Sequence, residues 1–297
     1  MSLVRTLPLA PAAVAAVTLC VASAAGAKTA LPALAFANDG GGALDMYVLP
    51  SGALRARRLT TSPLDEFSPS WSPDGRTIAF RVNPRRSDVG DIWLMRADGR
   101  RKRNLTRTPR TAEWSPAWSP DGARIAYFSG VGEDVWAMRP DGTRRRNLTR
   151  SPGLDEYPTW SPDGRRLAFG SHRDGQFEVY AMAADGSRQV NLTRNTSSDQ
   201  WPAWSPDGRS IAFMSERDGS PDVFVMAADG SSPRNLTRTP GLEESHPAWL
   251  PDGRLSFTRH GRTGPIEVWV VGVDGDGAER LDLPAEPVFV FAWKRAG

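Results

Sequence analysis

Short apolar segments separated by turn residues recur along most of this chain, and helical periodicity is not sustained anywhere in it. The simplest segment is a triplet of an aliphatic residue, a small residue and an aromatic residue. Segments this short, bounded by Gly, Pro, Asp and Asn, are typical of β-strands. The triplet occurs at residues 34–36, 78–80, 125–127, 167–169, 211–213 and 255–257.

Three further segments recur in register with the triplet. A Trp-(Ser/Leu)-Pro-Asp-Gly sequence precedes it, an acidic residue with alternating apolar positions follows it, and an Arg/Asn-Leu-Thr sequence comes last. Proline sets φ at the first turn position and glycine adopts the left-handed φ that closes a hairpin. Each repeat therefore predicts four strands. The tryptophans that mark the repeats are Trp71, Trp118, Trp160, Trp204, Trp249 and, without its turn, Trp293.

The spacing and the two ends of the chain indicate a closed ring. The tryptophans lie 42 to 47 residues apart, a period typical of propellers and solenoids. The first repeat begins at its second strand, and the chain supplies a lone tryptophan strand at residues 289–293. We expect this strand to complete the first repeat. The sequence thus predicts an all-β fold, a six-bladed β-propeller of four-stranded antiparallel blades, closed by the C-terminal strand joining the N-terminal blade.

These motifs together resemble the repeats of the TolB propeller family. The resemblance rests on Trp-Ser-Pro-Asp-Gly, Ile-Ala-Phe, Asp-Val-(Trp/Phe)-x-Met and Asn-Leu-Thr, and it covers residues 31–297. TolB carries an additional N-terminal α/β domain for which this sequence has no segment, so we expect the propeller only. The chain has no Trp-Asp dipeptide, which disfavours a true WD-repeat protein. The resemblance implies a six-bladed propeller that makes protein contacts in the cell envelope.

Residues 1–27 are predicted to be a secretory signal peptide, which leaves residues 28–297 for the propeller. Arg5 precedes an Ala- and Val-rich run, and Ala25-Gly26-Ala27 fits the small-x-small cleavage pattern. An uncleaved anchor is the alternative. Cys20, the only cysteine, lies in this segment, so the rest of the chain has neither disulfides nor thiolate sites. We expect an exported protein, periplasmic or extracellular, in a bacterial envelope.

In five of the six repeats, the loop that leads to the tryptophan strand carries a carboxylate four or five residues before the tryptophan. Because these strands are innermost, the carboxylates should ring one mouth of the central channel. Like charges at close range attract a cation, so we predict a site for a basic peptide segment or a calcium-like ion. The alternative is that these acids cap strand ends or pair with arginines of neighbouring loops. The residues are Glu66, Glu113, Asp155, Glu156, Asp199 and Glu244.

The predicted opposite face carries ten cations in the turns of the first three repeats. Such a crescent fits anionic lipid headgroups or an acidic wall polymer, whereas a solvated arginine-rich surface is the alternative. Nucleic acid is not expected, because these turns lack interleaved aromatic residues. The crescent comprises Arg55, Arg57, Arg58, Arg100, Arg101, Lys102, Arg103, Arg144, Arg145 and Arg146.

The histidines offer the alternative function. His172, His246 and His260 are predicted to lie on the same face as the acids. Some propeller lyases bind metal through histidine. The alternative hypothesis is therefore a carbohydrate-active lyase or hydrolase with a metal bound by His246 and His260. The histidine spacing matches no zinc signature, and neither a nucleophile elbow nor a phosphate loop occurs.

Function should therefore lie in residues that differ between repeats, because the repeated residues build the blades. The sequence favours an exported, non-enzymatic propeller that binds a protein or peptide at an acid-lined channel mouth. We expect a monomer, with no cofactor other than a calcium-like ion at that mouth.

Overall fold

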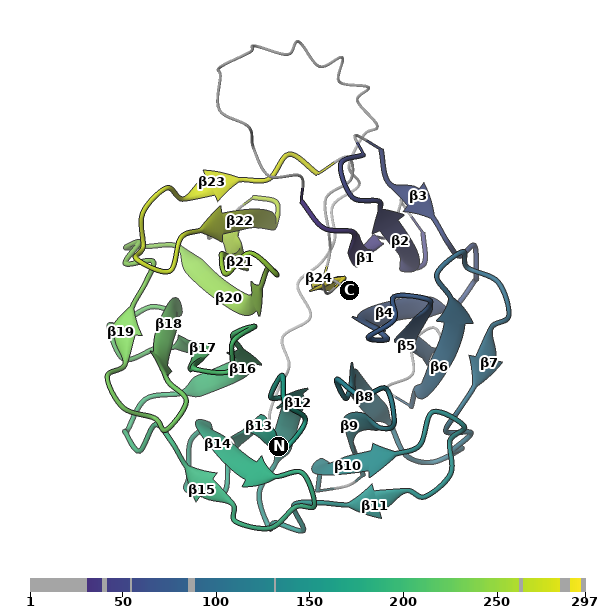
Figure 1. Ribbon diagram of the computed structural model, residues 1–297, viewed down its shortest axis with the longest axis horizontal. Coiled ribbons are helices and arrows are strands. Elements are labelled where there is room, and N and C mark those ends of the chain that lie inside the picture. Colours follow the sequence, from purple (N-terminus) through teal and green to yellow (C-terminus); the bar gives the residue numbers. More distant parts are fainter. Residues whose placement is uncertain are drawn as a thin grey trace.

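The computed structural model describes residues 31–38, 42–53, 55–84, 89–130, 132–261, 264–283 and 289–294, and the predicted signal peptide lies outside them. The described residues form 24 strands in six four-stranded antiparallel sheets. The sheets surround a central axis as the blades of a propeller, here numbered 1 to 6 (Figure 1). None of these residues belongs to a helix that could span a membrane. The predicted fold class is confirmed.

The first three blades each have a tryptophan strand innermost and a two-residue strand outermost. From inside outward, blade 1 is β24 (Phe289–Trp293), β1 (Leu34–Asn38), β2 (Asp45–Leu49) and β3 (Arg57–Arg58); blade 2 is β4 (Asp65–Trp71), β5 (Thr77–Asn83), β6 (Asp91–Arg96) and β7 (Arg103–Asn104); blade 3 is β8 (Glu113–Trp118), β9 (Ile125–Ser129), β10 (Asp134–Met138) and β11 (Arg146–Asn147).

The last three blades repeat this arrangement. Blade 4 is β12 (Asp155–Trp160), β13 (Arg166–Ser171), β14 (Glu178–Ala183) and β15 (Val190–Asn191); blade 5 is β16 (Asp199–Trp204), β17 (Ser210–Ser215), β18 (Asp222–Ala227) and β19 (Arg234–Asn235); blade 6 is β20 (Glu243–Trp249), β21 (Leu255–His260), β22 (Glu267–Val271) and β23 (Glu279–Arg280).

The ring closes where the two ends of the propeller meet. Strand β24 pairs with β1, with Trp293 opposite Leu34 and Ala292 opposite Ala35. Figure 1 shows β24 beside β1 at the centre of the ring. The Trp293 indole also donates a hydrogen bond to the Ser256 hydroxyl of blade 6 at 2.7 Å. The predicted closure is therefore confirmed.

The apolar core lies between blades, and the repeated tryptophan joins one blade to the next. Trp160 of blade 4 packs with Ala126 and Val135 of blade 3. Its Nε1 donates to the Ala117 carbonyl of blade 3 at 3.1 Å. Trp71 and Trp249 make the same bond to the blade before them, at 3.2 and 3.0 Å. Trp118 and Trp204 pack against the preceding blade without this hydrogen bond, so the apolar packing between blades is the shared need that explains why the residue recurs.

The Asn-Leu-Thr sequence holds each short outer strand in place. In blade 3, Asp134 accepts hydrogen bonds from Asn147 at 2.7 Å and from Thr149 at 3.0 Å. The Thr149 hydroxyl in turn accepts a bond from the Val135 amide at 3.0 Å. A two-residue strand makes few ladder bonds, so these side-chain bonds supply the rest. The motif is explained by the blade itself.

Each blade contributes its connections to two opposite faces. The Pro-Asp-Gly turns and the turns between the third and fourth strands share one side, here called the turn face. The loops that enter the inner strands and those that leave the second strands share the other side, here called the loop face. The predicted acids, histidines and channel mouth belong to the loop face.

Candidate binding site at the channel mouth

Five of the six predicted carboxylates occupy one repeated position, five residues before the tryptophan of their blade. All five are buried, with at most 3% of the residue surface exposed. We call them the carboxylate layer. It consists of Glu66, Glu113, Asp155, Asp199 and Glu244.

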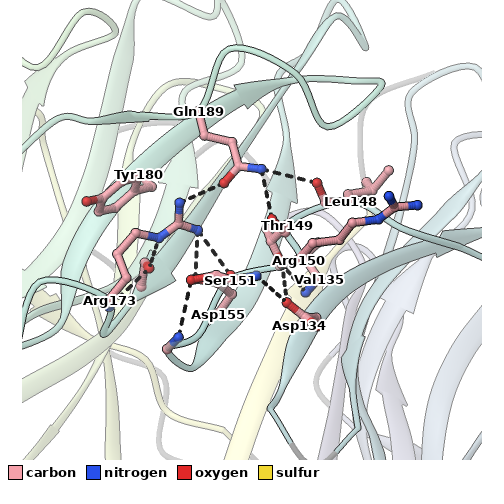
Figure 2. Close-up of polar contacts among 12 residues, drawn as sticks. Asp134, Val135, Leu148, Thr149, Arg150, Ser151, Asp155, Arg173, Tyr180 and Gln189 are labelled. Atoms are coloured by element: carbon pink, nitrogen blue, oxygen red, sulfur yellow. Dashed lines mark hydrogen bonds and ion pairs between the residues drawn. The ribbon is translucent and has the colours of Figure 1, made fainter.

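Two members of the carboxylate layer are bound by arginines of the adjoining strand pair. The Arg173 guanidinium donates to both carboxylate oxygens of Asp155 at 3.1 Å, and its other nitrogen donates to Gln189 at 2.7 Å (Figure 2). Arg217 binds Asp199 in the same way, at 3.0 and 3.1 Å. Both arginines follow the second strand of the same blade, so the pair fastens a loop-face connection to the inner strand.

The other three members find different partners. Glu244 accepts a hydrogen bond from Arg259 at 2.8 Å, and Glu66 lies 3.3 Å from the Lys102 ammonium. Glu113 accepts bonds from the Thr108 hydroxyl at 2.6 Å and from other hydroxyls nearby. Burial raises the pKa of four of these carboxyls, and the neighbouring hydrogen-bond donors oppose this rise. The four are Glu66, Glu113, Asp155 and Glu244.

The carboxylate layer therefore holds strands and loops together, as the pairing alternative expected. Its members point to polar partners inside the protein, and four of them pair with a cation there, whereas Glu113 has hydroxyl partners. One oxygen each of Glu66 and Glu113 has no hydrogen-bond partner among the described residues. The carboxylates are themselves a repeated feature of the blades. A role for them in partner binding stays a prediction.

The next two positions of the same inner strands form a different layer, the mouth layer. A β-bulge occurs here, because the pairing with the second strand shifts before the tryptophan. The bulged residue has a positive φ of 46° to 53° and stands just before a proline. Bulges redirect side chains and are common beside functional sites. The bulged residues are Ser68, Ser115, Tyr157, Trp201 and His246.

Six rings at this level form a continuous series across blades 2 to 6, here called the aromatic arc. Neighbouring ring centroids lie 4.1 to 6.2 Å apart, in one tilted, two stacked and two edge-on pairs. Such contacts are the preferred geometries of aromatic pairs. The arc runs in the order Phe67, Trp114, Phe128, Tyr157, Trp201 and His246.

Glu156 is the predicted carboxylate that belongs to the mouth layer. It lies beside Glu133 of the preceding blade. Burial, followed by the Glu133 carboxyl, raises the pKa of Glu156 to about 9. With its pKa raised this far, Glu156 keeps its proton at neutral pH. The pair is a place where an approaching cation would favour ionisation.

Arg81 supplies a positive group next to the arc. It is fully buried, and its guanidinium stacks on Trp114 and lies 5.1 Å from the Phe67 centroid. Arg81 follows the apolar triplet of blade 2. The equivalent residue differs in every other blade, being Ala37, Phe128, Gly170, Met214 and Thr258.

The sequence comparison with known families gives one decisive match. Residues 82–283 match the sequence model of the TolB beta propeller domain. The chain belongs to the TolB β-propeller family. No curated protein matches it in sequence.

Solved structures share this propeller fold at low sequence identity. TolB from Acinetobacter baumannii has 21% identity and a TM-score of 0.76, over 89% of this chain and 67% of that one. A chain of a nidogen/laminin complex has 13% identity and a TM-score of 0.70, over 89% and 99%. Oligogalacturonate lyase from Vibrio parahaemolyticus has 16% identity and a TM-score of 0.60, over 83% and 73%. These likenesses show the fold, which serves binding proteins and enzymes alike.

The histidines of this TolB-type propeller have partners other than a metal. His246 stacks on Trp201, and burial, followed by nearby His260, lowers its pKa to about 4. His260 lies 3.3 Å from Glu243, and His172 contacts Phe177 edge-on. No cluster of three or more His, Cys, Asp or Glu residues suited to a metal occurs in the described ranges. Metal at His246 and His260, and a calcium-like ion at the mouth, both stay predictions.

The predicted basic crescent lies at the rim of blades 1 to 3, and its residues are exposed, although Arg58 and Lys102 pair with the buried carboxylates of Asp45 and Glu66. Several of them also join blades. Arg103 donates to the Pro140 carbonyl at 2.6 Å, and Arg145 donates to the Leu105 carbonyl at 2.9 Å. The remaining members in blades 2 and 3 are Arg100, Arg101, Lys102, Arg144 and Arg146. Contact with an anionic surface stays a prediction.

The central channel widens into a cavity of about 540 Å³ toward the turn face. The tryptophans of all six blades line it, together with alanines and prolines from the inner strands and their turns. The channel wall is thus built from repeated residues, whereas the mouth layer varies from blade to blade.

Sequence reasoning missed the aromatic arc, although the signal was present. The residues three and four positions before each tryptophan are the ones that change between otherwise similar repeats. Pattern reading placed weight on the repeated carboxylates instead. The bulge that directs the varied side chains toward one another is visible only in the fold.

Proposed function

We propose that this protein is an exported, non-enzymatic scaffold that holds a protein or peptide at the loop-face mouth of its channel. The aromatic arc is the observation that supports this function. Aromatic residues that pack against one another and keep part of their surface accessible are the usual energetic centres of protein interfaces. The family membership and the likeness to a chain of a nidogen/laminin complex agree with a protein partner.

Within this proposal, Glu156 is the predicted carboxylate that contacts the partner. A lysine or arginine of the partner near Glu156 would favour ionisation of the Glu156 carboxyl and bind the resulting charge. The carboxylate layer acts beneath the contact by positioning the inner strands. The preferred partner segment therefore combines a basic residue with apolar or aromatic neighbours.

The test compares partner recovery from an envelope extract of the source cells by variants of the mature protein. Trp201→Leu removes an aromatic surface from the arc, and Glu156→Gln removes the titrating carboxyl. Trp136→Leu, on β10 away from the mouth, is the matched control. Loss of an interface centre costs at least about 2 kcal/mol, which is a roughly thirtyfold loss of affinity.

We expect the Trp201 variant to recover far less partner and the Trp136 variant to recover as much as the unchanged protein. Glu156→Gln should weaken recovery less and reduce its dependence on salt, since a charge contact is lost. Equal recovery by all variants would contradict a binding site at the mouth.

A further inference from the structure

The first residue of the outermost strand acts as a clamp between blades. Arg57 of blade 1 donates to the carbonyl oxygens of Ala97 and Asp98 in blade 2, at 3.0 and 3.2 Å. Arg103 and Arg234 make the equivalent bond from blades 2 and 5 to the blades that follow them. A long cationic side chain at this position thus covers the junction of two blades at the rim.

Blades 4 and 6 lack this clamp, since they carry Val190 and Glu279 at the position. Val190 stands where the clamp would be, and it lies opposite Ala181 of β14 just as Arg57 lies opposite Val48 of β2. Valine is too short to cross the junction and has no donor, and 41% of Val190 is exposed. A cavity of about 650 Å³ opens at this junction of blades 4 and 5. Its size is within the range of small-molecule sites.

The walls of this cavity, here called the rim pocket, combine an apolar floor with a cationic border. Met182, Val190 and Leu192 contribute to the floor. The cationic border comes from three parts of blade 4, namely the start of β13, the turn before β15 and the loop after β15. The arginines that line it are Arg165, Arg166, Arg188 and Arg194.

The charges at the rim pocket are unbalanced. Within the described part of the chain, these four arginines form no ion pair at 4 Å or less. The Arg166 side chain donates to the Ala228 carbonyl at 3.4 Å and its guanidinium lies 4.5 Å from the Trp204 ring centroid, and the Arg194 side chain donates to the Asn191 carbonyl at 3.1 Å. Asp229 is the lining carboxylate, and it already accepts a bond from the Ser231 amide at 2.9 Å. Asp163 adds a second carboxylate near Arg165 and Arg166.

We propose that the rim pocket binds an anionic group, a carboxylate or phosphate ester, joined to a short hydrocarbon chain. Guanidinium groups match the geometry of both anions and bind them through paired hydrogen bonds. The floor provides an apolar surface where the hydrocarbon is removed from water. The site lies at the outer rim and shares no residue with the channel mouth, so it is independent of the proposed peptide site.

Titration calorimetry with hexyl phosphate tests the proposal on the mature protein at low ionic strength. We expect saturable binding of one hexyl phosphate per chain, at least about tenfold tighter than inorganic phosphate, because phosphate alone cannot use the floor. Hexanol, which lacks the anion, should not bind measurably. Equal affinity for inorganic phosphate, or no saturable binding, would overturn the proposal.

Substitutions at the pocket localise the binding. Val190→Glu copies the residue that blade 6 carries at this position, Glu279, so the blade tolerates it and the pocket gains a repelling charge. Arg188→Ala removes one border cation. We expect each change to weaken hexyl phosphate binding at least about tenfold.

Arg146→Ala is the matched control, since it makes the same net charge change at the same repeat position of blade 3. It should leave binding within about twofold of the unchanged protein. If Val190→Glu and Arg146→Ala weaken binding equally, the anion responds to overall charge and the pocket proposal fails.

A further arm separates a membrane lipid from a soluble ligand as the source of the anion. Vesicles that contain phosphatidylglycerol are sedimented with the unchanged protein and with Val190→Glu. Vesicle binding that Val190→Glu abolishes assigns the pocket to a lipid. Hexyl phosphate binding that depends on Val190, without such vesicle binding, assigns it to a soluble anion.

Discussion

Asp199 and Trp201 are two residues apart in β16, yet they belong to layers with opposite properties. Asp199 is fully buried and bound by Arg217, and carboxylates occupy the same position in four other blades. Trp201 stands on the bulge with part of its surface exposed, and the same position holds Ser, Tyr or His in other blades. A residue that every blade repeats meets a need that every blade has. A residue that varies in an otherwise repeated strand is where a specific partner can be recognised.

Breaking the buried pair of blade 5 should have the largest effect. Asp199→Ala leaves the Arg217 guanidinium facing a site without its counter-charge, which typically costs about 3 kcal/mol of unfolding free energy. Urea denaturation measures this loss. The double change Asp199→Leu with Arg217→Met should cost clearly less, since both charges leave together. A cost below about 1 kcal/mol for Asp199→Ala would show that the carboxylate layer does not hold the blades.

The second effect concerns Glu156, whose pKa is raised from 4.5 to about 9, mainly by burial and next by Glu133. Between these values the folded state keeps a proton that the unfolded state releases, so stability falls as pH rises. Gln cannot ionise. At pH 8 the free energy of unfolding of Glu156→Gln should therefore exceed that of the unchanged protein by about 1 kcal/mol or more, which raises Tm by about 2–4 °C. The gain should vanish near pH 4. Thermal unfolding at a series of pH values checks this, and parallel profiles for the two proteins would contradict it.

The smallest effect is expected immediately beside the largest. Gln200 follows Asp199 in β16, and its side chain donates to the Ser198 hydroxyl at 3.0 Å. Because this position varies between blades, Gln200→Ala should change the unfolding free energy by less than about 0.5 kcal/mol. The same urea titration used for Asp199→Ala measures it. A loss similar to that of Asp199→Ala would remove the distinction between the two layers.

Much of the fold was predictable because the same sequence motifs recur in successive blades of a propeller. Each copy of Trp-Ser-Pro-Asp-Gly predicts the same hairpin, and the separated first and last strands predict the closure between β1 and β24. The pairing of Arg173 and Arg217 with nearby acids was also foreseeable, since each follows the second strand of its blade.

The site was less predictable. Trp114 and Phe128 are fourteen residues apart on two strands, and Tyr157 comes from another blade, yet their rings form one series. Sequence spacing cannot show that the bulge brings them together. The rim pocket was equally hard to predict. Val190 marks a missing clamp only when its strand position is known to be equivalent to that of Arg57.

By itself the sequence determined the blade, its turns, their number and the closure, because these depend on local turn chemistry and on alternation repeated at a constant period. Only the tertiary structure decided which carboxylates bind partners inside the protein and which of the varied side chains meet at the mouth. The physical reason is that burial and charge compensation depend on neighbours from other strands and blades. A repeat tells which residues are equivalent, whereas only the assembled ring tells which of them touch.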